Sequence, residues 1–127
     1  MQQHQDPTFT LGRRPFGLTF ANKEKSFGGY TLFAPQTSEG LVYLIDEQGE
    51  VVHQWQLPVR AGRDAVLLPN GNLGYNGSHR TSANLYPAWD LWHGGDFYEV
   101  TPDNEVVWHY EDIFHHHDAQ WRSEGVV

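Results

Sequence analysis

An internal repeat constrains the fold of this 127-residue chain more than any other feature. Residues 43–55 (YLIDEQGEVVHQW) align with residues 98–110 (YEVTPDNEVVWHY), 55 positions later. A second match, residues 63–65 (RDA) with residues 117–119 (HDA), has a spacing of 54. Two matches at nearly one spacing indicate a duplicated structural unit. A period of about 40 to 55 residues that carries about four strands is typical of a β-propeller blade.

Short β-rich runs, separated by turn residues, fill most of the sequence. The predicted strands lie within residues 30–34, 41–46, 51–56, 65–76 and 97–110, the last two ranges holding two strands each. Asn70-Gly71 is the strongest hairpin signal, because both residue types tolerate the positive φ that tight turns need. Residues 46–50 and 101–105 predict two further hairpins. No window shows an apolar period of 3.6 residues, so the sequence predicts an all-β chain.

These strands predict antiparallel four-stranded β-propeller blades. Residues 1–28 form an N-terminal arm and residues 29–127 a partial propeller. Within it, blade strands cover about 30–56, a full blade about 65–110, and the next blade starts at about 115. About two blades cannot close a propeller, which needs at least four. We therefore expect a piece of a longer protein, because the sequence stops inside a repeat, or a subunit whose sheets are completed by other chains as a homo-oligomer or complex.

Composition excludes several classes of function. The chain is 39% hydrophobic and 14% aromatic, which is enough to build a core. The formal net charge of −8 argues against a nucleic-acid partner, because phosphate binding needs clustered Lys and Arg. The absence of cysteine removes disulfide and thiolate chemistry. The first twenty residues contain no signal peptide, and no apolar run is long enough to span a membrane. The compartment is left open.

In a propeller the connection between blades and the loop between the second and third strands emerge on one face. On that face we expect residues 115–118 (HHHD) and the long loop 78–96. Long loops in compact domains are often functional. Tyr86, Trp89 and Trp92 could wall a pocket for an aromatic ligand, or could seal the blade or bind a neighbouring subunit. The polar candidates in this loop are His79, Arg80 and His93, which could reach a bound anion or could be ordinary surface side chains.

Three interpretations of the histidine cluster stay open. Two of its imidazoles with Asp118 could bind a metal ion. One imidazole oriented by Asp118 could act as an acid–base or nucleophilic group. The cluster could also be a structural hydrogen-bond network at a blade junction. His53 and His109 fall on outer strands, where we expect them to be exposed and assign them no role.

Several motifs resemble the opening of the aryl-sulfate sulfotransferase family. They are residues 29–33 (GYTLF), 42–46 (VYLID), 49–55 (GEVVHQW), 68–72 (LPNGN) and 116–118 (HHD), the last followed by Gln120, Arg122 and Glu124-Gly125. The similarity runs from about Gly29 to Gly125. Members of this family are six-bladed β-propellers that move a sulfuryl group from an aryl sulfate to a phenol through a transient sulfohistidine.

The resemblance implies a site built on His116, His117 and Asp118 at the channel mouth. The two histidines would contact the sulfuryl group, Asp118 would orient an imidazole, and the 78–96 loop would help bind the phenolic acceptor. No cofactor or metal is implied. The sulfated histidine and a sulfate-binding arginine of the family lie in later blades, so we expect this chain alone to be inactive. The alternative function is a non-catalytic, propeller-like interaction module completed by other chains.

Overall fold

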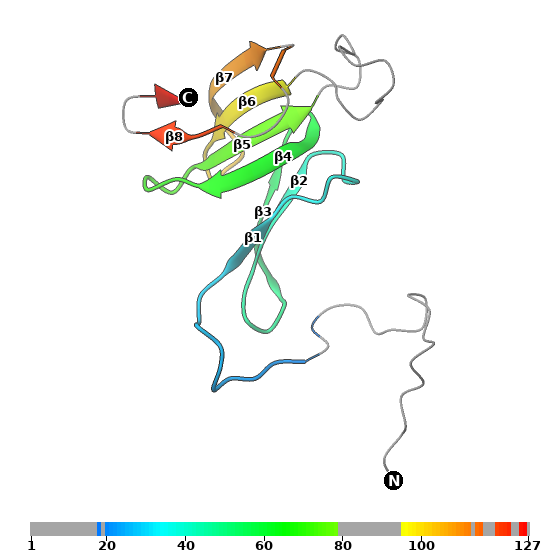
Figure 1. The fold of residues 1–127 in the computed structure, drawn as a ribbon, viewed down its shortest axis with the longest axis vertical. Coiled ribbons are helices and arrows are strands. Elements are labelled where there is room, and N and C mark those ends of the chain that lie inside the picture. The colour runs from blue at the N-terminus through cyan, green and yellow to red at the C-terminus, as the bar shows by residue number, and fades with distance from the viewer. Residues whose placement is uncertain are drawn as a thin grey trace.

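The computed structural model describes residues 18, 20–78, 95–112, 114–115, 119–122 and 125–126. These residues contain no helix and form three antiparallel sheets (Figure 1). The first sheet has the order β1 (Thr31–Phe33), β2 (Leu41–Ile45), β3 (Val51–Gln56). The second has the order β4 (Arg60–Leu67), β5 (Leu73–Ser78), β6 (Gly95–Val100), β7 (Val106–Asp112), and the third pairs β8 (Trp121–Arg122) with β9 (Gly125–Val126). The all-β prediction is confirmed.

The three predicted hairpins are present, and their turns have the same pattern of backbone hydrogen bonds. In each, the first turn residue donates its N–H to the carbonyl four residues later and accepts an N–H from the residue three later. The donor–acceptor groups are Asp46 with Glu50 and Gly49, Leu68 with Asn72 and Gly71, and Thr101 with Glu105 and Asn104. The residue before the closing position has a positive φ, of 81°, 86° and 67° respectively. Glycine and asparagine are the residues that adopt this conformation at least cost.

The sequence repeat is also a repeat of strand register. In the β2–β3 pair the register shifts by one residue between Leu44 and Ile45. In the β6–β7 pair it shifts between Glu99 and Val100, which follow the first two residues by the 55-residue spacing of the repeat. A bulge at the same place in both hairpins twists both strand pairs in the same way. The two hairpins are therefore copies of one structural unit.

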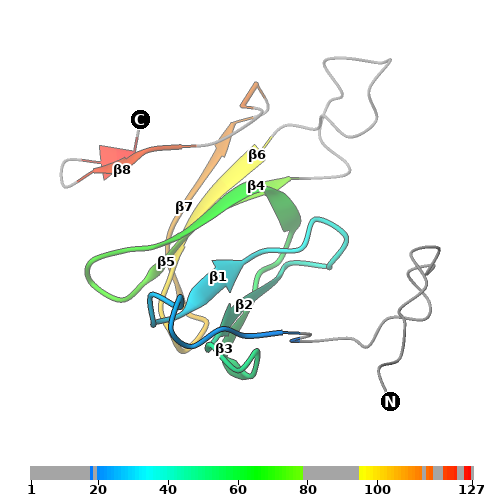
Figure 2. The same ribbon diagram turned by 60° about the horizontal axis from the view of Figure 1, so that its bottom comes forward.

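The core lies between the first and second sheets, which face one another in Figure 2. Its buried members are Val42, Trp55, Leu57, Ala61, Leu73, Tyr75, Tyr98 and Val100. Trp55 is 2% exposed, and its indole Nε1–H donates to the Thr101 carbonyl at 3.1 Å. The backbone N–H of Gln56 donates to Asn104 Oδ1 at 2.7 Å. The last strand of the first sheet is thus held against the β6–β7 turn of the second.

The structure differs from the sequence prediction at the start of β4. We expected this strand to begin at residue 65, after the polar residues of 62–64 (GRD). It begins at Arg60, and the register with β5 shifts between Ala61 and Ala65. The polar residues are thus accommodated as an irregularity inside the strand. β5 and β6 also extend to Ser78 and Gly95, so both ends of the predicted 78–96 loop belong to strands.

Candidate functional site at one end of the second sheet

All nine predicted site residues lie outside the described residues. They are His79, Arg80, Tyr86, Trp89, Trp92, His93, His116, His117 and Asp118. The structure therefore does not test their predicted roles. It does describe the strand ends to which the segments that carry them are attached, and the side chains around those ends.

Both segments attach to the same end of the second sheet. Ser78, the last residue of β5, pairs with Gly95, the first residue of β6. Gly95 in turn pairs with Asp112, the last residue of β7. Adjacent strands are about 4.8 Å apart, so Ser78, Gly95 and Asp112, the described residues to which the two segments are attached, are direct neighbours. The expectation that the two segments leave the sheet on one side is confirmed for these attachment points, and the β4–β5 and β6–β7 turns lie at the opposite end.

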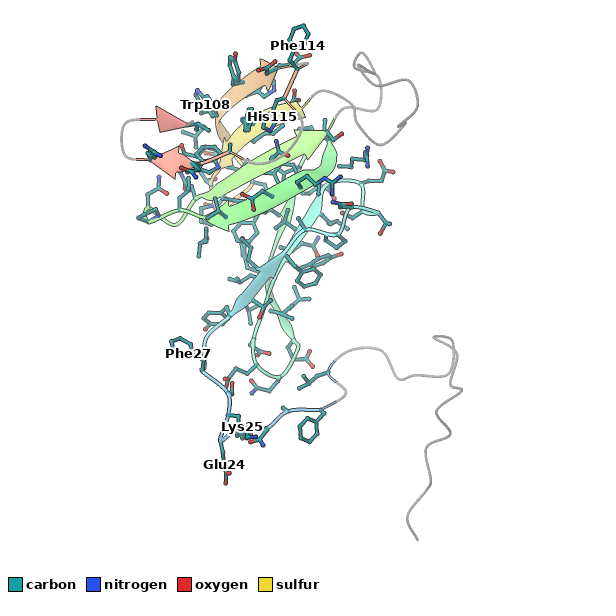
Figure 3. The ribbon with its side chains drawn as sticks, viewed as in Figure 1. Glu24, Lys25, Phe27, Trp108, Phe114 and His115 are labelled. Carbon is teal, nitrogen blue, oxygen red and sulfur yellow. The ribbon has the colours of Figure 1, made fainter. Side chains whose placement is uncertain are left out.

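His115 returns over this end of the sheet (Figure 3). The chain turns because the Phe114 amide donates to Asp112 Oδ1 at 2.8 Å and the His115 amide donates to the Asp112 carbonyl at 3.1 Å. The imidazole then packs on Phe97, with ring centroids 4.2 Å apart. A Cβ at Gly95 would lie only 2.9 Å from His115 Cδ2, so a glycine at this position makes the close approach possible.

Arg60 adds a cationic group to the row of residues that pair across this end of the sheet, which so far comprises Ser78, Gly95 and Asp112. It pairs with Ser78 in the β4–β5 register, and its guanidinium Nη2 donates to Ser78 Oγ at 3.4 Å. Sequence reasoning missed Arg60 because it lies in a stretch that we read as a connection. The row therefore brings together a guanidinium, a hydroxyl, a glycine and a carboxylate, with the imidazole of His115 above it.

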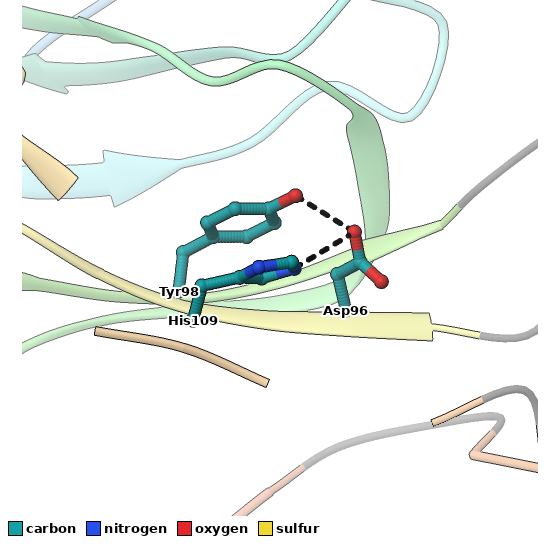
Figure 4. Close-up of polar contacts among 3 residues, drawn as sticks. All are labelled: Asp96, Tyr98 and His109. Carbon is teal, nitrogen blue, oxygen red and sulfur yellow. Dashed lines mark hydrogen bonds and ion pairs between the residues drawn. The ribbon is translucent and has the colours of Figure 1, made fainter. Parts of the chain in front are cut away.

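On the opposite face of the sheet, Asp96 binds two side chains (Figure 4). The Tyr98 hydroxyl donates to Asp96 Oδ2 at 2.7 Å, and His109 Nε2 lies 3.3 Å from the same oxygen. The rings of Tyr98 and His109 stack with centroids 4.5 Å apart. Asp96 is fully buried, and burial together with the neighbouring Asp96 carboxylate raises the pKa of Tyr98.

His109 is a second residue whose role sequence reasoning missed. It is exposed, as expected, with 42% of its side chain accessible, but the buried Asp96 holds its ring. A carboxylate that contacts one imidazole nitrogen fixes the orientation of the ring. The available signal was Asp96 itself, a carboxylate that directly precedes the strand predicted from residue 97.

Within the described ranges, no group of three or more His, Asp or Glu side chains is arranged to hold a metal ion. Nor do those ranges contain a helix with the length and apolar character of a membrane span. Comparison of the chain with protein-family models, with curated proteins and with solved structures gave no match. The resemblance to aryl-sulfate sulfotransferases therefore remains an expectation from the quoted motifs.

Proposed function

We propose that this chain contributes part of a sulfuryl-transfer site in an aryl-sulfate sulfotransferase-like β-propeller. The observation that supports the proposal is the pairing of Ser78, Gly95 and Asp112, the strand ends to which the two candidate segments are attached. His116 and His117 would contact the sulfuryl oxygens, and Asp118 would orient one imidazole. The aromatic residues of 79–94 would hold the phenolic acceptor.

The chemistry requires cationic donors around a transferring anionic group. A histidine nitrogen bonds to sulfur as the bond between sulfur and the aryl oxygen breaks, and the aryl oxygen leaves as a phenolate. The acceptor oxygen then bonds to sulfur as the nitrogen–sulfur bond breaks, and the acceptor's proton passes to a base. Preorganised imidazolium and guanidinium donors stabilise the charge on the sulfuryl oxygens. Arg60 already brings a guanidinium, and His115 an imidazole, to this end of the sheet.

The propeller arrangement is part of the same proposal. Its support is the four-stranded antiparallel meander β4-β5-β6-β7, preceded by a three-stranded sheet with the same order and the same bulge. The β8–β9 hairpin follows at the position where a third unit would begin. Face-to-face packing of successive meanders is how propeller blades bury their apolar faces.

The proposal is tested with 4-nitrophenyl sulfate as the probe and backbone amide NMR shifts as the readout. We expect shifts at Ser78, Gly95 and Asp112 and none at the turns 68–72 and 101–105. Replacing both His116 and His117 with Gln should weaken binding about tenfold or more, because each substitution removes a charge-assisted hydrogen bond to the sulfate group.

Two controls make the result specific. His53→Gln changes an imidazole whose Nε2 lies 3.0 Å from the Pro102 carbonyl, at the opposite end of the sheet, and should leave binding unchanged. 4-Nitrophenol, which lacks the sulfate group, should bind more weakly than the ester. Absence of shifts at the sheet end, or shifts that survive both histidine substitutions, would refute the sulfuryl-binding role and favour the non-catalytic module.

A further inference from the structure

β7 carries an unusual concentration of exposed apolar side chains. Val106 is 50%, Val107 58%, Trp108 38% and Tyr110 53% exposed. β7 is also the edge strand of the second sheet among the described residues. Exposed apolar edges of this kind promote association with another chain or segment.

Within the chain, the strand of the first sheet that corresponds to β7 is already covered by a hairpin turn. β3 is the equivalent strand of the first sheet, and two of its side chains bind consecutive carbonyls of the turn 101–104. The Trp55 indole donates to the Thr101 carbonyl at 3.1 Å, and His53 Nε2 lies 3.0 Å from the Pro102 carbonyl. This contact leaves Trp55 only 2% exposed. A hairpin turn is therefore the natural partner of this strand surface.

The 55-residue repeat maps these two contact residues onto β7. His53 corresponds to Trp108 and Trp55 to Tyr110. Both replacements keep a large ring and a hydrogen-bond donor, the Trp108 indole N–H and the Tyr110 hydroxyl. Among the described residues, Trp108 stacks on Tyr110 and contacts Trp121 edge-on. Neither the Trp108 indole N–H nor the Tyr110 hydroxyl has a hydrogen-bond acceptor among these residues. Figure 3 shows Trp108 beside β8.

We propose that Trp108 and Tyr110 dock the turn 46–49 of a second copy of this chain. This turn has the same two backbone hydrogen bonds as the turn 101–104 and precedes it by the repeat spacing. The Tyr110 hydroxyl would donate to the partner's Asp46 carbonyl, and the Trp108 indole to the partner's Glu47 carbonyl. The contact joins two different surfaces, so copies associate head to tail.

Contacts within the chain at the turn 46–49 are compatible with the proposed hydrogen bonds to the Asp46 and Glu47 carbonyls. Ser26 Oγ donates to the Glu47 carboxylate, and Leu18 lies against Gly49. The Ser26 bond uses the Glu47 side chain and not its carbonyl oxygen. The Asp46 carbonyl accepts the Gly49 amide, just as the Thr101 carbonyl accepts the Asn104 amide while it also binds Trp55. Because β7 and the turn both carry carboxylates, and the chain has a net charge of −8, we expect salt to strengthen association by screening repulsion.

A complementation experiment tests the head-to-tail contact by sedimentation equilibrium. One variant, Trp108→Ala with Tyr110→Ala, retains only the turn. A second, Gly49→Val, retains only the β7 surface, because valine is strained at a φ of 81°. Each variant should be monomeric alone, the mixture should form a one-to-one heterodimer, and the unmodified chain should form larger species. Circular dichroism establishes that each variant is folded.

Two single substitutions keep the test decisive if Gly49→Val does not fold. Tyr110→Phe removes only the hydroxyl and should weaken association about two- to tenfold. Glu47→Pro makes the turn more like 101–104 and removes a negative charge, so it should strengthen association. Tyr30→Ala, at an aromatic that is 68% exposed outside the contact, should change nothing.

A chain that stays monomeric at all concentrations and salt levels would overturn the inference. So would self-association that survives loss of both Trp108 and Tyr110, or a mixture of the two variants that fails to associate. The readout is mass and not ligand binding, so this inference and the sulfuryl-transfer proposal succeed or fail separately.

Discussion

At the scale of single residues, Asp96 is a fully buried carboxylate in the second sheet. A buried carboxylate is costly unless hydrogen bonds compensate its lost hydration. Tyr98 supplies one of these bonds and His109 a second polar contact. The same arrangement makes ionisation of Tyr98 unfavourable, because a phenolate would lie beside a carboxylate in a buried site.

This arrangement predicts a loss of stability at alkaline pH. The pKa of Tyr98 is raised above its ordinary value of about 10, and burial likewise raises the pKa of Tyr75. Above about pH 10 the unfolded chain releases these protons while the folded chain retains them, so the free energy of unfolding falls as the pH rises. Urea unfolding between about pH 8 and 11 should show this decrease.

Substitution separates the contribution of Tyr98 from the general alkaline response. Tyr98→Phe should make the fall in unfolding free energy with pH shallower. Tyr30→Phe, at a residue that is 68% exposed, should leave its slope unchanged. An identical slope for Tyr98→Phe and the unmodified chain would show that Tyr98 is not responsible.

At the scale of elements, the β6–β7 hairpin depends on Asn104 in two ways. Asn104 adopts a φ of 67°, which closes the turn, and its Oδ1 accepts the Gln56 amide from the neighbouring sheet. The equivalent residues of the other two hairpins, Gly49 and Gly71, provide the turn conformation without a side-chain acceptor. Asparagine therefore couples this turn to the first sheet.

The two roles can be measured separately. Asn104→Gly keeps the turn but removes the acceptor, and should lower the free energy of unfolding by about 1 kcal/mol. Asn104→Ala should cost about 1 kcal/mol more, because alanine is strained at positive φ. Gly71→Ala, at an open turn with a φ of 86°, measures that strain alone. Denaturant unfolding that finds Asn104→Gly as stable as the unmodified chain would rule out the coupling.

At the scale of the whole molecule, stability depends on the two sheets covering one another. Trp55 reaches from the first sheet into a core formed with Tyr75 and Tyr98 of the second. Its indole N–H also binds the second sheet directly. We therefore expect the two sheets to unfold as one cooperative unit.

Trp55→Ala tests this expectation, and should lower the free energy of unfolding by about 3 to 5 kcal/mol. Tyr110→Ala, at the equivalent but 53% exposed position, should cost less than about 1 kcal/mol under monomeric conditions. Hydrogen exchange should show that amides of β2 and β6 are deprotected together by Trp55→Ala. Loss of protection in the first sheet alone would indicate that the sheets unfold independently.

Local chemistry explains what could be predicted from sequence. The turn residues Gly49 and Asn70-Gly71 mark hairpins because positive φ is a property of the residue type. The repeat of residues 43–55 in 98–110 predicted equal strand pairs, and the shared bulge confirms it. The predicted location of the candidate segments at one end of the second sheet also follows from strand order alone.

The remaining features depend on contacts between residues far apart in the chain. The start of β4 at Arg60 depends on its pairing with Ser78, which is distant in sequence. The contact of Asp96 with His109 requires the β6–β7 register, and the return of His115 over Gly95 requires a turn at Asp112. The sequence by itself thus determined the strands, the turns and their repetition, because these follow from local preference and period. Only the tertiary structure decided which polar side chains share one environment, because burial and register bring them together.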